Sequence, residues 1–268
     1  MLSFSYWKLG LLLGIILICV LVAYYLSKRK ESFANKQYKY GILICCYDRP
    51  EFLIQTLNSL KTTNKEDLNE SIIYIIDDRS SNNKTTTLIE DYDIMNMEGI
   101  DGLELKIDRN RENLGIAKSL EKGFTFLFPK CEYLTNIDSD VLIKPNWLSK
   151  LHEVYERSNY EKNDGNGVLV SGFNCIPPNC DHKILSTNDL YHVKKTIGGI
   201  NTFFHRDMFP QFINVIKNNV KNWDWRLCDY CKEHNIPIVV SNPSVIQHIG
   251  FTGLNSFGKK KYDYANDF

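Results

Sequence analysis

The chain has 268 residues, of which 43% are hydrophobic and 24% are charged, with 32 basic against 32 acidic side chains. This length fits one globular domain of about 230 residues preceded by one short segment. The zero formal charge and the scattered basic residues give no electrostatic basis for binding nucleic acid. An aromatic content of 12% excludes a chain that is disordered throughout.

The first segment is apolar. Residues 9–26 contain no charged side chain, and together with Trp7 they approach the ~20 residues that a membrane-spanning helix needs. Trp7, Tyr24 and Tyr25 occupy aromatic-belt positions, and a basic cluster over 28–30 closes the segment. A cleaved signal peptide is the alternative, but the stretch is long for a signal core and lacks an Ala-x-Ala site before the basic cluster. We therefore predict a single-pass anchor in the lipid bilayer.

The anchor is expected over 1–27 and a polar stalk over 28–38. Basic residues are more numerous after the apolar segment than before it, which favours a cytosolic catalytic domain. Sequons at Asn69 and Asn83, together with a possible pairing of Cys175 with Cys180, point the other way. The sequence leaves the side of the membrane open.

From residue 39 onward, strands and helices are expected to alternate. The apolar run 40–47 predicts a buried strand, and Pro50 is a favourable first residue for the following helix. The further elements predicted in chain order are strands at 71–76 and 103–107, a helix from Asn113 to Phe128, a strand entering Asp138, a helix at 145–157, a strand at 168–172, helices at 207–219 and 223–234, and strands at 236–240 and 245–250. This alternation predicts an α/β fold with a mainly parallel sheet and helices on both faces.

Acidic residues follow three of the predicted strands, at Asp48, at Asp77 with Asp78, and at Asp138 with Asp140. Ligands of parallel α/β sheets bind at the carboxyl ends of the strands. Asp138 and Asp140 would point to one side if the strand ran straight through both, and at a strand end they can jointly face a metal ion. A hard divalent cation would remove the cost of burying two carboxylates. The alternative is a solvated turn before the helix that starts near Pro145.

These motifs together resemble the family 2-like group of GT-A glycosyltransferases over roughly residues 39–256. The resemblance rests on five segments: Ile44-Cys-Cys-Tyr-Asp-Arg-Pro-Glu51, Ile76-Asp-Asp-Arg-Ser80, Asn113-Leu-Gly-Ile-Ala-Lys118, Asp138-Ser-Asp140 and Gln247-His-Ile-Gly250. Asp-Arg-Pro-Glu and Trp-Asp224-Trp also resemble N-acetylglucosaminyltransferase I. The resemblance implies a Rossmann-like GT-A domain over 39–268, with a nucleotide-binding half at 39–144 and an acceptor-binding half at 145–268.

The resemblance also implies which residues bind the nucleotide sugar: Tyr47, Arg49, Asp78, Asn113, Lys118 and Asp138. A phosphate near the helix that Asn113 opens is physically reasonable, because a helix N-terminus favours anions. Arg49 could instead cap its loop, and Lys118 could simply be a surface residue. Asp77 could hold a turn, as paired acids at a strand end often do.

By the same resemblance, Asp138, Asp140 and His248 would bind Mn²⁺ or Mg²⁺. Oxygen-rich sites shared with phosphates suit these hard cations, and the metal would offset the charge on the departing nucleoside diphosphate. For His248 the alternative is a polar cap after an apolar strand.

Asp224 is the candidate general base, because an inverting transfer needs one carboxylate to take the proton of the acceptor hydroxyl. Trp223 and Trp225 would desolvate it and stack on sugar faces. Gly198 and Gly199 could let the backbone approach the donor sugar or the acceptor. A helix N-cap is the alternative role for Asp224.

The predicted function is the transfer of a single sugar from a nucleotide-diphosphate sugar, with a UDP-sugar favoured, to a hydroxyl of a glycan, protein or lipid acceptor, with inversion. The chain lacks the Gln-x-x-Arg-Trp element of processive synthases. Two alternatives stay open: a sugar nucleotidyltransferase, and an inactive carbohydrate-binding protein held at the membrane.

Overall fold

A computed structural model of the chain describes Gly14 and residues 37–95, 103–163, 165–251 and 263–268. The chain divides into two units, Met1–Gln37 and Tyr38–Phe268, and the fold described below is that of the second unit. The predicted membrane segment at 9–26 lies outside the described residues apart from Gly14. Among the residues that the structure describes, no helix combines the length and the apolar character needed to cross a bilayer.

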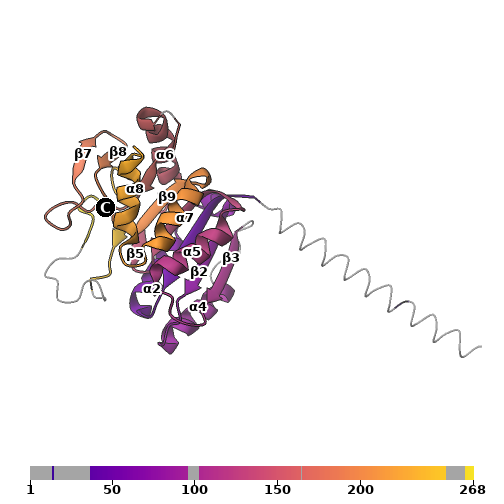
Figure 1. Ribbon diagram of the computed structural model, residues 1–268. Helices are drawn as coiled ribbons and strands as arrows, with labels where there is room; N and C mark the ends of the chain where they lie inside the picture. Colours follow the sequence, from indigo (N-terminus) through magenta and orange to yellow (C-terminus); the bar gives the residue numbers. More distant parts are fainter. Residues whose placement is uncertain (1–13, 15–36, 96–102, 164, 252–262) are drawn as a thin grey trace, which may run out of the picture. The chain divides into compact units, whose positions relative to one another are not determined.

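The described part of the domain is built on a nine-stranded sheet in the order β3-β2-β1-β4-β9-β6-β10-β8-β7. Its first half is parallel: β1 (Tyr38–Cys46) pairs with β2 (Ser71–Asp77) and with β4 (Cys131–Asp138), and β3 (Glu104–Arg109) pairs with β2 (Figure 1). The carboxyl ends of β1, β2 and β4 therefore meet at one edge of the sheet. This half confirms the predicted α/β fold with a parallel core.

The second half of the sheet is mixed. β9 (Asn201–His205) runs antiparallel to both β4 and β6 (Leu169–Ser171), and β10 (Ile238–Ser241) pairs in parallel with β6. β8 (Tyr191–Lys194) and β7 (Ile184–Thr187) complete the sheet with antiparallel pairing. The sequence analysis did not predict β9 as a strand. The two glycines before this short apolar run predict a turn. The run becomes a strand because it pairs with β4 and β6.

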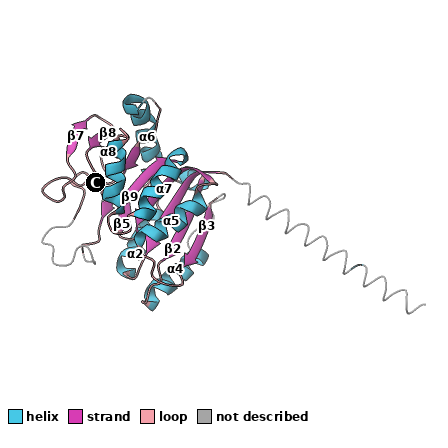
Figure 2. Ribbon diagram, viewed as in Figure 1, coloured by secondary structure: helices cyan, strands magenta, loops and turns pink. Residues whose placement is uncertain are grey.

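Helices cover both faces of the sheet, as predicted (Figure 2). One face carries α5 (Ile116–Leu127), α7 (Phe209–Asn218) and α8 (Trp223–Glu233). The other carries α2 (Pro50–Leu60), α3 (Lys65–Asn69), α4 (Asn83–Met95) and α6 (Trp147–Asn163). The sequence analysis missed α4, because its polar start and weak apolar periodicity give little helical signal. Among its described side chains, Ile89 is buried in the core and Leu88 packs against it. A 3-10 turn (Arg206–Met208) precedes α7.

A separate two-stranded sheet pairs β5 (Val141–Ile143) with β11 (Ile246–His248) in antiparallel fashion. β4 ends at Asp138, as the predicted strand entering this residue did, and Asp140 lies in the turn before β5, so no straight strand runs through both aspartates. A side chain of α2 bonds to the start of β5: Thr56 Oγ1 accepts a hydrogen bond from Val141 N at 2.9 Å. The turn sets Asp140 between α2 and β11.

Candidate active site

The carboxylate of Asp140 joins two segments that are distant in the sequence. Its Oδ2 lies 2.8 Å from Arg49 Nη1 and 3.3 Å from His248 Nε2. The Asp140 residue is buried, with 6% of its surface exposed. A buried carboxylate between a guanidinium and an imidazole is the central feature of this site.

The start of α2 positions Arg49. Both Asp48 and Arg49 have positive φ angles, 52° and 59°, so the chain turns sharply between β1 and the helix. The guanidinium carbon of Arg49 lies 4.5 Å from the centre of the Phe52 ring, a cation–π contact. Within the described residues, Nε and Nη2 of this side chain are buried without a hydrogen-bond partner. Unpaired buried donors are costly, and they suit an anionic ligand at this point.

Strand pairing brings His248 to Asp140. His248 stands opposite Val141 in the β5–β11 pair, and Ile249 N donates to Asp140 O at 2.9 Å. A Cβ atom on Gly250 would lie 1.9 Å from Asp140 Oδ2 and 2.7 Å from His248 Nε2. Position 250 therefore requires glycine, because any other side chain would displace one of these two groups.

The charges of the two aspartates are unequal. Burial raises the pKa of Asp138 well above its usual range, and the negative charges of Asp140 and Asp224 add to this effect. Burial also acts to raise the pKa of Asp140, but its hydrogen bond to His248 and the charges of His248 and Arg49 outweigh burial and lower the pKa. The surroundings therefore favour the ionised form of Asp140 and the neutral form of Asp138.

Asp224 reaches this group from α8. Its Oδ2 accepts a hydrogen bond from Gly199 N at 3.2 Å, and the Gly199 carbonyl accepts one from Asn136 Nδ2 at 3.0 Å. Because Asp138 N donates to Ile200 O at 2.9 Å, the segment before β9 ties Asp224 to the end of β4. Burial raises the pKa of Asp224. The sequence analysis missed Asn136, whose role depends on the unpredicted strand β9.

The structure changes two interpretations of the start of α8. The N-cap position belongs to Asn222, so Asp224 is not the N-cap and lies within the first turn. Trp223 is buried in the core, and a Cβ on Gly199 would lie 2.5 Å from its ring, so Trp223 cannot stack on a sugar. Gly199 is needed for this close packing.

Trp225 differs from Trp223 because 44% of its surface is exposed. Its ring centre lies 5.4 Å from that of His182, a buried residue that the sequence analysis missed. His182 Nδ1 is 2.9 Å from Thr196 Oγ1, and a Cβ on Gly198 would lie 3.5 Å from His182 Nε2. Trp225 therefore keeps part of its ring at the surface, and its role in binding an acceptor stays a prediction.

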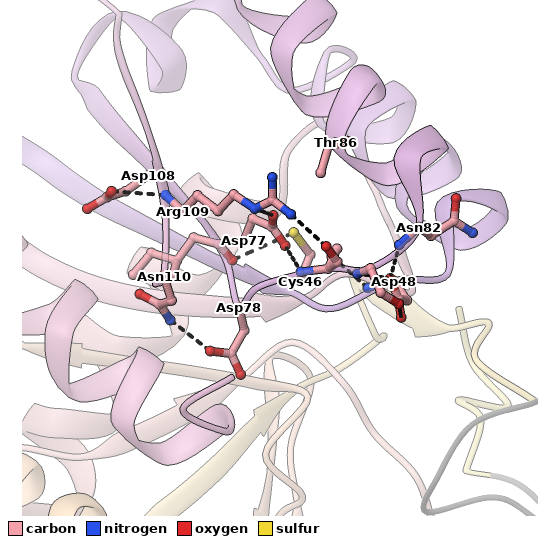
Figure 3. Close-up of polar contacts among 12 residues, drawn as sticks. Cys46, Asp48, Asp77, Asp78, Asn82, Thr86, Asp108, Arg109 and Asn110 are labelled. Atoms are coloured by element: carbon pink, nitrogen blue, oxygen red, sulfur yellow. Dashed lines mark hydrogen bonds and ion pairs between the residues drawn. The ribbon is translucent and has the colours of Figure 1, made fainter. Parts of the chain in front are cut away.

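Asp78, at the end of β2, is occupied by its own surroundings. Its carboxylate accepts a hydrogen bond from Asn110 Nδ2 at 2.7 Å (Figure 3). It also accepts hydrogen bonds from the backbone amides of Leu114 and Gly115, both at 2.8 Å. Asp78 is 5% exposed. In the structure this side chain orders the loop before α5, and contact with the base or ribose stays a prediction.

Asp77 and Asp48 also hold loops. Asp77 Oδ2 lies 3.1 Å from Arg109 Nε, and its Oδ1 accepts from Ser80 N at 2.9 Å. Asp48 Oδ1 accepts from the amides of Ser81 and Asn82 at 2.9 and 2.8 Å (Figure 3). These bonds agree with the alternative that Asp77 holds a turn.

Three other predicted donor-binding residues lie at the surface of the same edge: Tyr47, Asn113 and Lys118. α5 begins at Ile116 rather than at Asn113, because Gly115 takes a positive φ of 79° before the helix. Asn113 therefore belongs to the loop held by Asp78. Asp229, a second carboxylate of α8, forms an exposed ion pair with Arg226 at 3.1 Å.

The group formed by Asp138, Asp140 and His248 fits a divalent cation by its chemistry. Among the residues that the structure describes, no group of three His, Cys, Asp or Glu side chains has the geometry of a metal site. However, two carboxylates and an imidazole are the ligand types that Mn²⁺ accepts. Gly250 lies against Asp140 and His248, where a Cβ atom would come within 1.9 Å of Asp140 Oδ2.

The sequence is similar to known glycosyltransferases. The profile described as "Glycosyl transferase family 2" matches residues 41–213. A curated protein of Haemophilus influenzae, described as an uncharacterized glycosyltransferase, is 26% identical over 122 residues, which cover 45% of this chain and 33% of that protein.

Solved structures share the fold. The chain resembles S. aureus TarS 1-349, solved in complex with UDP-GlcNAc, with a TM-score of 0.54 and 14% identity over 81% of this chain and 62% of that one. It also resembles GalNAc-T7, solved with UDP, GalNAc and Mn²⁺, with a TM-score of 0.59 and 13% identity over 80% of this chain and 44% of that one. The chain thus spans about a third of the curated relative and less than two thirds of each of these structures.

Proposed function

Because the chain belongs to glycosyl transferase family 2, we propose that it transfers one sugar from a UDP-sugar to an acceptor hydroxyl, with inversion and with the help of a divalent metal. The observation that carries this proposal is the convergence of Arg49, Asp140 and His248 at the carboxyl edge of the sheet. UDP or UDP-GlcNAc bound to TarS, and UDP with Mn²⁺ bound to GalNAc-T7, support the choice of donor and metal.

Asp138, Asp140 and His248 would hold Mn²⁺ or Mg²⁺. When bound, the metal supplies positive charge that stabilises the departing nucleoside diphosphate. The raised pKa of Asp138 supports this assignment, because a bound cation would offset the cost of ionising this buried carboxylate. The unpaired guanidinium donors of Arg49 would bind phosphate oxygens through charge-assisted hydrogen bonds.

Asp224 would act as the general base. The acceptor oxygen forms a bond to the anomeric carbon while the bond from that carbon to the diphosphate oxygen breaks, and Asp224 takes the hydroxyl proton. A carboxylate whose pKa is raised by burial is a stronger base than a solvated one. Trp225, exposed beside Asp224 in the chain, would stack on the acceptor.

The same proposal includes a membrane anchor over 1–27 and an acceptor that is a glycan, a protein or a lipid. Both parts are supported by the sequence alone. The charge bias around the anchor supports a cytosolic domain.

Substitution of Asp140 tests the proposal. We expect Asp140→Ala to lower sugar transfer by about a thousandfold, because the metal charge contributes several kcal/mol to the transition state. Mn²⁺ should raise the melting temperature of the wild-type protein with UDP and leave that of Asp140→Ala unchanged.

The matched control is Asp207→Ala, because Asp207 is an 82% exposed carboxylate that lies 3.3 Å from His205 at the surface. This control should keep both the activity and the Mn²⁺ response. Full transfer by Asp140→Ala in the presence of metal would contradict the proposed metal site.

A further inference from the structure

Residues 263–268, here called the C-terminal strap, contact the segment that carries His248. The carbonyl of Asp263 lies 3.0 Å from His248 Nδ1. The side chain of the neighbouring Gln247 forms two hydrogen bonds with the backbone of Ala265: Nε2 donates to the Ala265 carbonyl at 2.9 Å, and Oε1 accepts from its amide at 2.8 Å. The strap therefore runs directly behind the imidazole.

A second set of contacts fixes the strap to the domain. Asp267 Oδ1 accepts a hydrogen bond from the hydroxyl of Ser244, and Asp267 Oδ2 accepts one from Asn174 Nδ2 at 3.3 Å. Ser244 and Asn174 are both buried. Cys175 and Ala265 form an antiparallel bridge, so the strap pairs with the segment after β6. Several independent contacts thus hold six residues in one position.

The contact with Asp263 decides which nitrogen of His248 carries the proton. A backbone carbonyl can only accept, so a neutral His248 bound to it must carry its proton on Nδ1. Nε2, which lies 3.3 Å from Asp140 Oδ2, is then the nitrogen left to bind a metal. An imidazole nitrogen must present its lone pair to bind a metal, and the partner of the other nitrogen orients the ring.

We propose that the C-terminal strap is a positioning element that holds the His248 ring and its tautomer for metal binding, with Gln247 and Asp267 as the positioning residues. This inference rests on the proposed function, because it takes His248 as a metal ligand. Neither residue touches the metal or the sugar. Their effect passes through the Asp263 carbonyl.

The test measures Mn²⁺ affinity by electron paramagnetic resonance of free Mn²⁺, using the full chain with saturating UDP. We expect Asp267→Ala and Gln247→Ala each to weaken Mn²⁺ binding by about 10- to 100-fold, the usual effect of losing the support of a metal ligand. Asp267→Asn keeps one acceptor and should have a smaller effect. Asp207→Ala is the control and should bind Mn²⁺ as the wild type does.

A spectroscopic readout separates positioning from general destabilisation. At alkaline pH without metal, ¹⁵N chemical shifts of His248 should show the Nδ1–H tautomer in the wild-type protein and a mixture of tautomers in Asp267→Ala and Gln247→Ala. Melting temperatures identify any variant that fails to fold, and having two variants keeps the test available if one does.

Two failures can be told apart with His248→Ala. If His248→Ala binds Mn²⁺ as tightly as the wild type, the proposed metal site itself is wrong. If His248→Ala loses affinity while folded Asp267→Ala and Gln247→Ala retain it, the metal site stands and the positioning role of the strap is overturned.

Discussion

The ends of β2 and β4 carry similar pairs of aspartates with opposite surroundings. Asp78 accepts hydrogen bonds from one side-chain amide and two backbone amides of the neighbouring loop. Asp77 pairs with the guanidinium of Arg109 at the end of β3 (Figure 3). Asp140 instead meets Arg49 and His248, which lie 91 and 108 positions away in the sequence. A carboxylate satisfied by local amides builds structure. One that faces cationic groups from distant segments is suited to bind a ligand.

The largest expected effect concerns the base. Asp224→Asn should lower kcat by about 10²- to 10⁴-fold, because proton transfer to a positioned carboxylate typically contributes this much. UDP and Mn²⁺ should bind to this variant normally in calorimetric titrations, since the amide keeps the shape of the side chain. Near-normal turnover by Asp224→Asn would place the base elsewhere.

Asp78→Ala and Asp138→Asn test whether the aspartates at the two strand ends have different roles. Asp78→Ala should lower the free energy of unfolding by about 3 kcal/mol, because it leaves the buried donors of Asn110, Leu114 and Gly115 without their acceptor. Urea denaturation measures this change.

Asp138→Asn is the matched variant for that measurement. Burial favours the neutral form of Asp138, so a neutral amide should preserve the free energy of unfolding while transfer is lost. If both variants lose equal stability, the distinction between structural and ligand-binding aspartates fails.

His182 gives a pH test of the region around Trp225. Burial lowers the pKa of His182 from 6.5 to about 4, so the folded protein keeps the ring neutral while the unfolded chain protonates it. The stabilising contribution is present above pH 6.5 and is lost as the pH falls through the folded value. At pH 5 the loss is about 2 kcal/mol.

Urea titrations from pH 7 to pH 4 check this effect. His182→Gln cannot take up the proton, so its free energy of unfolding should depend less on pH over that range than that of the wild type. Equal pH dependence in both proteins would show that the ring is not buried in its neutral form.

The smallest expected effect is that of Gly250→Ala. Its Cβ would lie 1.9 Å from Asp140 Oδ2, so the carboxylate must move away from His248. We expect Mn²⁺ affinity to fall about tenfold, equivalent to about 1.4 kcal/mol, with UDP affinity in the absence of metal unchanged. Titrations with and without Mn²⁺ measure the two quantities, and an unchanged Mn²⁺ affinity would show that Asp140 does not need its present position.

Local patterns in the sequence were sufficient for much of the fold. The buried runs of β1 and β2 and the Pro50 start of α2 were predicted because each is a short-range signal. β9 and β5 were missed, since their strand character comes from pairing with segments far along the chain. Trp223 and Trp225 looked equivalent, and only the packing against Gly199 separates the buried ring from the exposed one.

The sequence by itself determined the family, the parallel core and the identity of Asp138, Asp140, Asp224 and His248 as candidates, because short motifs and strand periodicity are encoded by neighbouring residues. Only the tertiary structure decided that Arg49 binds Asp140, that Asp78 holds a loop and that the strap supports His248. These contacts join residues separated by 15 to 108 positions in the sequence. Sheet pairing and core packing bring such residues together, and no local sequence pattern specifies either.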